Sequence, residues 1–111
     1  MRHPVITRLV EALGAIGEEV EVDLTDGHPA LVARTGGLVF AVAWPGDEGI
    51  FLRLRLDAGH VEDAHLSPAP PGALAYESLL RTPADVDQVI DLLMESLETA
   101  TRIRAAGRTM S

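Results

Sequence analysis

A short stretch between residues 60 and 65 holds the densest set of possible metal ligands in the chain. It reads His60-Val61-Glu62-Asp63-Ala64-His65, so two imidazoles and two carboxylates fall within six residues. Both groups bind divalent metals such as zinc and manganese. On a strand, His60 and Glu62 would share a face and His65 would point away, whereas an irregular loop would let all three converge. The spacing matches no zinc motif, and acidic surface loops often carry histidines. A metal or small-molecule site of His60, Glu62 and His65, with Tyr76 as a further candidate, is therefore our alternative prediction.

The rest of the sequence carries no catalytic motif. It has no nucleophile turn of the Gly-x-Ser-x-Gly type, no phosphate-binding loop and no dinucleotide-binding fingerprint. Cysteine is absent, which excludes disulfides, thiolate metal sites and cysteine nucleophiles. Gly36-Gly37 lies between two expected strands, so no helix N-terminus follows it to receive an anion. We therefore expect a binding protein rather than an enzyme, and no cofactor.

Composition indicates one small folded domain with a strong negative charge. The 111 residues fit a single domain spanning residues 1–111, and 47% hydrophobic content is enough for a core. The chain has 17 acidic and 9 basic residues, a net charge of −8. Nucleic acids and anionic membranes are bound through dense positive charge, so neither is an expected partner. The first residues lack the apolar segment of a signal peptide, and no apolar run reaches the ~20 residues that span a bilayer. The expected location is the cytoplasm.

Hydrophobic spacing predicts one amphipathic helix followed by four strands. Residues 4–17 carry apolar side chains three and four positions apart, and Pro4 suits the first position of a helix. From residue 18 the period changes to two, as expected when alternate side chains face a core. Turn sequences such as Asp26-Gly27-His28-Pro29 separate the strands. We expect strands over residues 18–25, 30–34, 38–44 and 50–57.

The chain then becomes less regular until its last element. Thr82-Pro83-Ala84-Asp85 combines a capping residue, a proline at the first helical position and an acid that can complete a capping box. This pattern predicts a single helix from residue 83 to about residue 106. Before it, we expect a weak edge strand over 60–66, an irregular proline-rich connector over 67–72, and either a short helix or a strand over 73–80.

We predict an α+β fold in which one layer of helices covers one layer of sheet. Short connections between the strands favour hairpins, so the sheet should be a four- or five-stranded antiparallel meander. The N-terminal helix and the long C-terminal helix each need to bury an apolar face. Packing both on the same side of the sheet gives a two-layer sandwich. The predicted inner face of the sheet carries Val20, Val22, Leu24, Phe40, Val42, Leu52 and Leu54.

The outer face of this sheet is predicted to hold an apolar strip between carboxylates and arginines. A contiguous apolar strip on a small protein suggests an interface. About a two-fold axis, the acidic first strand of one copy could face the arginines of the other. Alternatively, the arginine stems only cover the strip while their charged ends stay in water. The predicted interface residues are Val39, Ala41, Phe51, Arg53 and Arg55.

The predicted element order and the acidity are together similar to those of small bacterial chaperone-like domains, such as the YbjN and type III secretion chaperone group. The likeness spans most of the chain and lies in topology and charge. Proteins of that group are typically dimeric and bind other proteins, so the resemblance implies a protein partner or a homodimer. Our leading hypothesis is therefore a non-enzymatic, adaptor- or chaperone-like protein-interaction domain. The alternative is a small-molecule or divalent-metal binding domain that uses residues 60–65.

Overall fold

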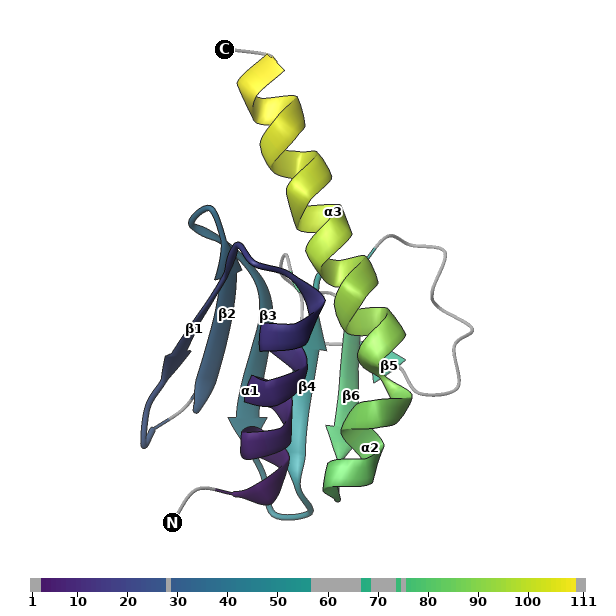
Figure 1. The fold of residues 1–111 in the computed structure, drawn as a ribbon. Helices are drawn as coiled ribbons and strands as arrows, with labels where there is room; N and C mark the ends of the chain where they lie inside the picture. Colours follow the sequence, from purple (N-terminus) through teal and green to yellow (C-terminus); the bar gives the residue numbers. More distant parts are fainter. Residues whose placement is uncertain (1–2, 28, 57–66, 69–73, 75, 110–111) are drawn as a thin grey trace.

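The computed structural model describes residues 3–27, 29–56, 67–68, 74 and 76–109 of the chain. It has an α+β fold that starts with a helix and ends with helices (Figure 1). The elements in order are α1 (Pro4–Ile16), β1 (Val20–Leu24), β2 (Leu31–Thr35), β3 (Leu38–Pro45), β4 (Ile50–Leu54), β5 (Ser67–Pro68), β6 (Tyr76–Leu80), α2 (Pro83–Gln88) and α3 (Ile90–Thr109).

The strands form one antiparallel sheet in the order β1-β2-β3-β4-β6-β5. The predicted pairing of the first four strands in chain order is confirmed. Residues 76–80, which fitted helix or strand equally well, form β6, and Ser78 of β6 lies opposite Leu52 of β4. The predicted irregular connector is wrong at its start, because Ser67 and Pro68 pair with β6 as a two-residue strand at the sheet edge, where proline is tolerated. The predicted strand over 60–66 lies outside the described residues.

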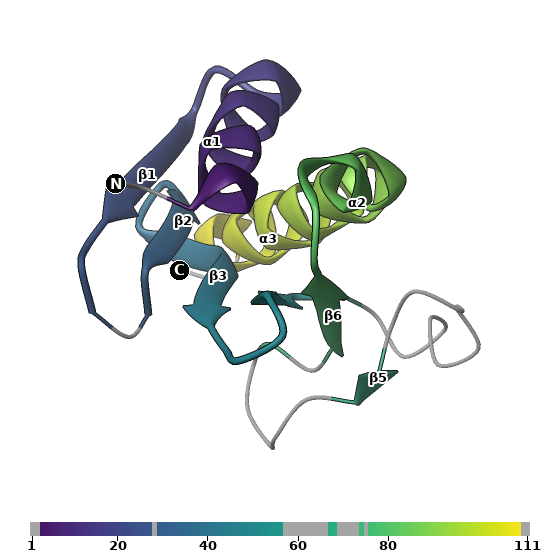
Figure 2. The same ribbon diagram turned by 90° about the horizontal axis from the view of Figure 1, so that it is seen from below.

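The described helices lie together on one face of the sheet, as predicted (Figures 1 and 2). The core fills the space between this helical layer and the sheet, and aliphatic side chains dominate it. Leu9 and Leu13 of α1 and Leu93 of α3 are fully buried against the strands. The sheet contributes Leu31, Ala33, Phe40, Ala41, Ala43, Ile50, Leu52, Leu54, Tyr76 and Leu80 to this core.

The predicted single C-terminal helix is in fact two helices that meet at Val89. Val89 has φ −112° and ψ 9°, and its N–H donates to the carbonyl of Val86, three residues back, at 3.0 Å. Such a bond tightens the last turn of α2 into a 3₁₀ geometry. Val86 and Val89 are both buried, so the apolar spacing that suggested one helix continues across the break.

Strand β3 contains a one-residue bulge at Phe40. Ala33 of β2 lies opposite Ala41, but the next residue, Arg34, lies opposite Val39, so Phe40 has no direct partner on β2. The bulge shifts the alternation, and both Phe40 and Ala41 enter the core. The predictions that Ala41 faces outward with Val39 and that Val42 faces inward are therefore wrong. Val42, opposite Arg53, takes the outer face.

Ser96 of α3 binds the sheet at this bulge. Its hydroxyl donates to the Phe40 carbonyl at 2.5 Å and accepts the Arg55 backbone N–H at 2.9 Å. Arg55 also uses its side chain here, because Nε donates to the Val39 carbonyl at 2.9 Å. Ser96 is fully buried. The Arg55 N–H also donates directly to the Phe40 carbonyl at 3.2 Å. Ser96 therefore joins a β3–β4 backbone hydrogen bond beside the bulge, and the Arg55 side chain binds the Val39 carbonyl, as buried polar groups require.

We expect Ser96→Ala to lower the free energy of unfolding by about 1–3 kcal/mol, because it removes two buried hydrogen bonds at the bulge. Urea unfolding followed by circular dichroism measures the change. Thr101→Ala is the matched control, since its hydroxyl donates only to the Leu97 carbonyl on the exposed side of the same helix. Equal stability of the Ser96→Ala variant and the wild type would contradict a structural role for this contact.

Asp85 caps helix α2 as the sequence predicted. Its carboxylate accepts the backbone N–H of Thr82 at 3.0 Å and of Arg81 at 2.8 Å. These bonds, that from Thr82 first, hold the pKa of Asp85 below its ordinary value of 3.8. A carboxyl whose pKa is lower in the folded state stabilises the fold fully above its unfolded pKa. That contribution is lost as the pH falls from 3.8 through the folded pKa.

We therefore expect the stability of the Asp85→Asn variant to fall less steeply than that of the wild type as the pH is lowered below 3.8. Thermal unfolding at a series of pH values between neutrality and pH ~2 tests this expectation. Asp91→Asn, which removes an exposed carboxylate near the start of α3, is the control. The prediction fails if Asp85→Asn and wild type lose stability with the same slope on the acid side.

Candidate functional site

The outer face of the sheet is the surface on which most of the predicted interface residues lie. Val39, Phe51 and Arg53 all belong to it and are partly exposed. Ala41 does not, because the bulge turns it into the core, where it is fully buried. The described helices all cover the opposite face (Figure 2). Sequence reasoning missed three apolar members of the outer face that the register places there: Val42, Trp44 and Leu79.

Arg53 organises the middle of the outer face. Its guanidinium carbon lies 5.1 Å from the centroid of the Trp44 ring, a cation–π distance. Its Nε also donates to the Glu77 carboxylate at 3.0 Å. Arg34 and Asp23 form a second ion pair between β2 and β1 on this face. The arginines of the face thus have acidic partners within the same chain, which lowers the cost of covering them with another surface.

Trp44 carries a hydrogen-bond donor that has no acceptor in the described structure. Its indole Nε1 is buried, and none of the described groups accepts its proton. A buried polar group without a partner costs about 1–3 kcal/mol, so such groups are rare in folded proteins. The ring lies opposite Phe51 on β4 and beneath Arg53. Trp44 therefore holds a buried N–H group that has no acceptor among the described residues.

Arg55, whose predicted place in the interface stays a prediction, also binds backbone groups of the sheet. Its guanidinium Nε is bound to the Val39 carbonyl and its backbone N–H to Ser96, so both groups serve the bulge. Phe51 is also held in place, because its ring lies directly over Gly46. A Cβ at that glycine would come within 2.4 Å of Phe51 Cε2. Arg55 thus belongs to the framework that positions the outer face.

The alternative site of His60, Glu62 and His65 lies outside the described residues, so this prediction remains open. Tyr76, the further candidate, is on the inner face of β6 and is buried in the core. Within the described ranges, three or more histidine, aspartate or glutamate side chains nowhere gather closely enough to hold a metal ion.

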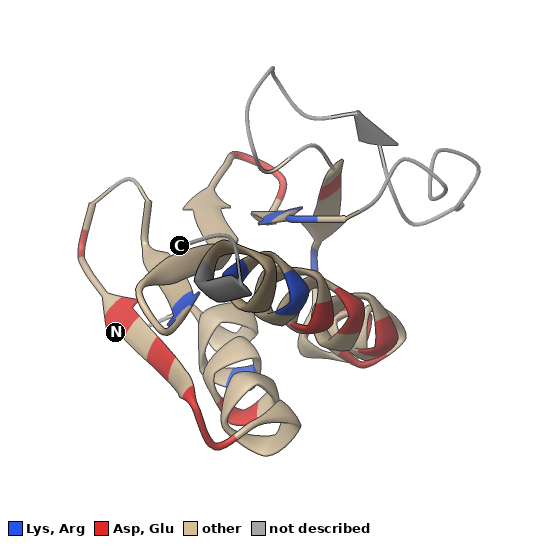
Figure 3. Cartoon of the chain, turned by 90° about the horizontal axis from the view of Figure 1, so that it is seen from above, with Lys and Arg blue, Asp and Glu red and all other residues tan. Residues whose placement is uncertain are grey.

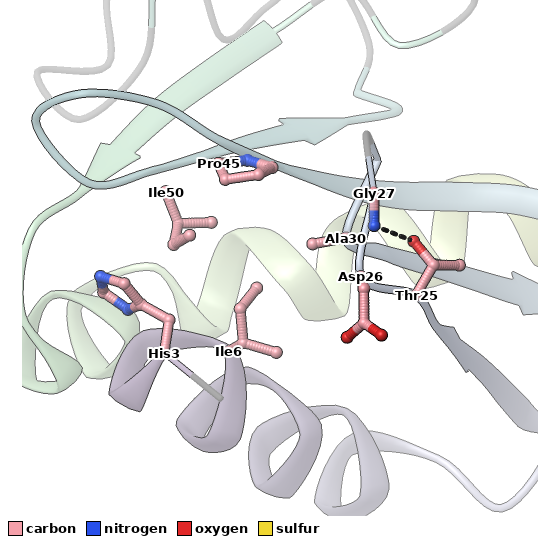
Figure 4. Close-up of a pocket in the computed structure, with 8 residues that line it drawn as sticks. All are labelled: His3, Ile6, Thr25, Asp26, Gly27, Ala30, Pro45 and Ile50. Carbon is pink, nitrogen blue, oxygen red and sulfur yellow. Dashed lines mark hydrogen bonds between the residues drawn. The ribbon is translucent and has the colours of Figure 1, made fainter. Parts of the chain in front are cut away.

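A hollow of about 450 Å³ opens at one end of the sheet, between α1 and two strand connections. Ile6, Ala30, Pro45 and Ile50 form apolar walls, while His3 and Asp26 lie at its two ends (Figure 4). The Nδ1 atom of His3 accepts the Val5 backbone N–H at 3.1 Å, which leaves Nε2 as the ring's proton donor when the imidazole is neutral. The volume and mixed lining are within the range of small-ligand pockets.

The wall that carries Asp26 is fixed by Thr25. The Thr25 hydroxyl donates to the Pro29 carbonyl at 2.7 Å and accepts the Gly27 N–H at 3.1 Å. This turn holds Asp26 on the exposed side of the hollow, with no ion-pair partner among the residues that the structure describes. The sequence indicated the turn but not the hollow, because Ile6 and Ile50 are brought to it only by packing of α1 on the sheet.

Acidic side chains gather along β1, at the edge of the sheet (Figure 3). Glu19, Glu21 and Asp23 are all exposed there, and Glu18 precedes them. Arg34 pairs with Asp23, and Arg104 approaches Glu19 at 3.8 Å, but Glu21 has no cationic partner among the described residues. This edge therefore has an excess of negative charge.

Comparison with known proteins gives no family or relative to guide assignment. No protein-family model, no curated protein and no solved structure matches the chain. The resemblance to YbjN and type III secretion chaperone domains thus has no support from these comparisons. Among the helices described, none combines the length and apolar character needed to cross a membrane.

Proposed function

We propose that this protein is a non-enzymatic protein-interaction domain that forms a homodimer through the outer face of its sheet. The observation that carries the proposal is the apolar centre of that face around Trp44, which lies on the side of the sheet away from the described helices. Val42 and Phe51 flank Trp44, and its indole N–H lacks an acceptor. A second surface placed on this face would add burial of its partly exposed apolar side chains.

The charges of the outer face favour a second copy as the partner. Arg53 with Glu77 and Arg34 with Asp23 are close pairs of opposite sign, so the face has little net charge despite the −8 of the whole chain. Two such faces approach with little repulsion. About a two-fold axis each pair can also exchange partners with the corresponding pair of the other copy.

We expect the wild-type chain to have twice the mass of one subunit in light scattering, and Arg53→Glu to have the mass of a single chain. The substitution removes the cation over Trp44. It also places a new carboxylate beside that of Glu77, and the two repel each other. Circular dichroism should show that the fold is retained, because Arg53 is on the surface.

Arg81→Glu is the control for this experiment. It makes the same change of charge at an exposed side chain that pairs with Glu48, away from the outer face. A dimer for Arg81→Glu and a monomer for Arg53→Glu would support the proposed face. A monomeric wild type, or a dimer that survives both substitutions, would refute it.

The hollow at the end of the sheet favours a second candidate function, the binding of a small organic molecule that carries an ammonium group. Asp26 offers a carboxylate at one end, His3 offers an N–H at the other, and the walls between them are apolar. A ligand with an ammonium group, a short hydrocarbon body and a terminal hydrogen-bond acceptor has the matching chemistry. This candidate is a second small-molecule site, separate from the prediction for residues 60–65, which stays open.

Titration of ¹⁵N-labelled protein with 5-aminopentanoate tests this candidate by NMR. We expect saturable shifts of the amides of Asp26, Gly27 and Ile50, and a loss of affinity of at least tenfold in Asp26→Asn, which removes the only carboxylate of the described lining. Asp47→Asn, on the exposed β3–β4 connection, should bind like wild type. Equal weakening by both variants, or no saturable shift in the wild type, would exclude the hollow as a binding site.

A further inference from the structure

Strand β1 is an edge strand whose outer side has no described neighbour (Figure 1). The Thr25 N–H donates to the Ala30 carbonyl at 2.9 Å, in line with the β1–β2 register. In an antiparallel ladder, hydrogen-bonded positions alternate. Asp23 and Glu21, two and four residues before Thr25, therefore direct their backbone groups toward β2. Val20, Val22 and Leu24 direct theirs away from the sheet, and these groups are free to pair with another strand.

The side chains of β1 also alternate between the two faces of the sheet. On each face they have room for contacts with a further strand. Val20, Val22 and Leu24 are on the inner face beside α1 but are only partly buried, because the sheet ends at β1. Glu21 and Asp23 are on the outer face and exposed. An added strand would thus cover apolar residues on one face and meet carboxylates on the other.

We propose that β1 accepts an extended basic segment of another protein as an additional antiparallel strand. The segment alternates apolar residues with Lys or Arg. Its apolar residues lie opposite Val20, Val22 and Leu24 and exchange backbone hydrogen bonds with them. Its cations lie opposite Glu21 and Asp23, since directly opposed residues share a face. Main-chain pairing provides affinity and the carboxylates provide selectivity for a basic sequence.

A second copy of the chain does not fit this edge. When β1 pairs with β1 of another molecule about a two-fold axis through Val22, Glu21 lies opposite Asp23 of that molecule. Every register that pairs at least three residues of β1 and keeps the inner faces on one side sets carboxylates against carboxylates, which is unfavourable. The same charges that prevent edge-to-edge association of identical chains therefore select a partner of opposite charge.

This inference does not depend on the proposed dimer, because the dimer is centred on Trp44 of β3 whereas the added strand binds the outward backbone groups of β1; Asp23, which pairs with Arg34, belongs to both surfaces. Arg53→Glu, which tests the dimer, leaves the backbone groups of β1 intact. If the dimer is disproved, the proposal for the β1 edge still holds. If the proposal for the β1 edge is disproved, the proposed dimer is unaffected.

The first test compares two labelled seven-residue peptides by fluorescence anisotropy, one alternating valine with arginine and the other alternating valine with glutamate. We expect saturable binding of the arginine peptide at least tenfold tighter than that of the glutamate peptide. An arginine peptide N-methylated at its valines keeps its charge but cannot donate to β1. It should bind at least tenfold more weakly. Equal binding of the methylated and unmethylated arginine peptides would overturn the proposal.

Two variants locate the binding on β1. Glu21→Lys should weaken binding of the arginine peptide and strengthen that of the glutamate peptide. Glu11→Lys, which makes the same change at an exposed position on α1, should leave the preference unchanged. Val22→Pro removes an outward N–H without touching the bonds to β2 and should abolish binding with the fold retained. Equal effects of Glu11→Lys and Glu21→Lys would show general charge attraction and overturn the proposal.

Discussion

The contact between Ser96 and the bulge in β3 determines which residues this protein shows on each face of its sheet. An extra residue at Phe40 shifts the register between β2 and β3, while the β3–β4 register is continuous and the Arg55 N–H donates to the Phe40 carbonyl at 3.2 Å. The Ser96 hydroxyl adds a hydrogen bond to each of these two backbone groups, and the Arg55 side chain binds the Val39 carbonyl. Because Ser96 is on α3, the same contact joins the helical layer to the middle of the sheet. The bulge also turns Ala41 inward, so Val42 and Trp44 face outward.

The elements that follow a strict hydrophobic period could be predicted from the sequence, and those that break the period could not. Helix α1 and the first four strands agree closely with their predicted ranges, because each buries one face and alternates accordingly. The bulge leaves no trace in β3, whose residues are apolar on both faces, so Ala41 was assigned to the wrong side. The break at Val89 was hidden for a similar reason, since Val86 and Val89 are both buried across it.

The candidate sites, too, could be predicted only where they follow from the hydrophobic period of a strand. The outer face was predicted in outline because Arg53 and Phe51 alternate with leucines along β4. The pairing of Arg53 with both Trp44 and Glu77 required knowledge of the β3 register and of a strand, β6, that the sequence left undecided. The hollow at the end of the sheet combines His3 and Asp26, which are far apart in the sequence and meet only because α1 packs there. Local sequence patterns do not indicate which residues far apart in the chain will lie close together in the fold.

The distribution of charge is consistent with two proposed interaction surfaces of opposite preference on one acidic chain. On the outer face Arg53 and Arg34 are paired with Glu77 and Asp23, so we propose that apolar contact governs association there. Along the edge of β1, carboxylates outnumber the arginines that reach them. Exposed charges act over about 10 Å at moderate ionic strength. The edge therefore repels another copy at the short range where strands would pair, while the outer face does not. Added salt should weaken binding of a basic strand much more than self-association, because only the edge relies on net charge.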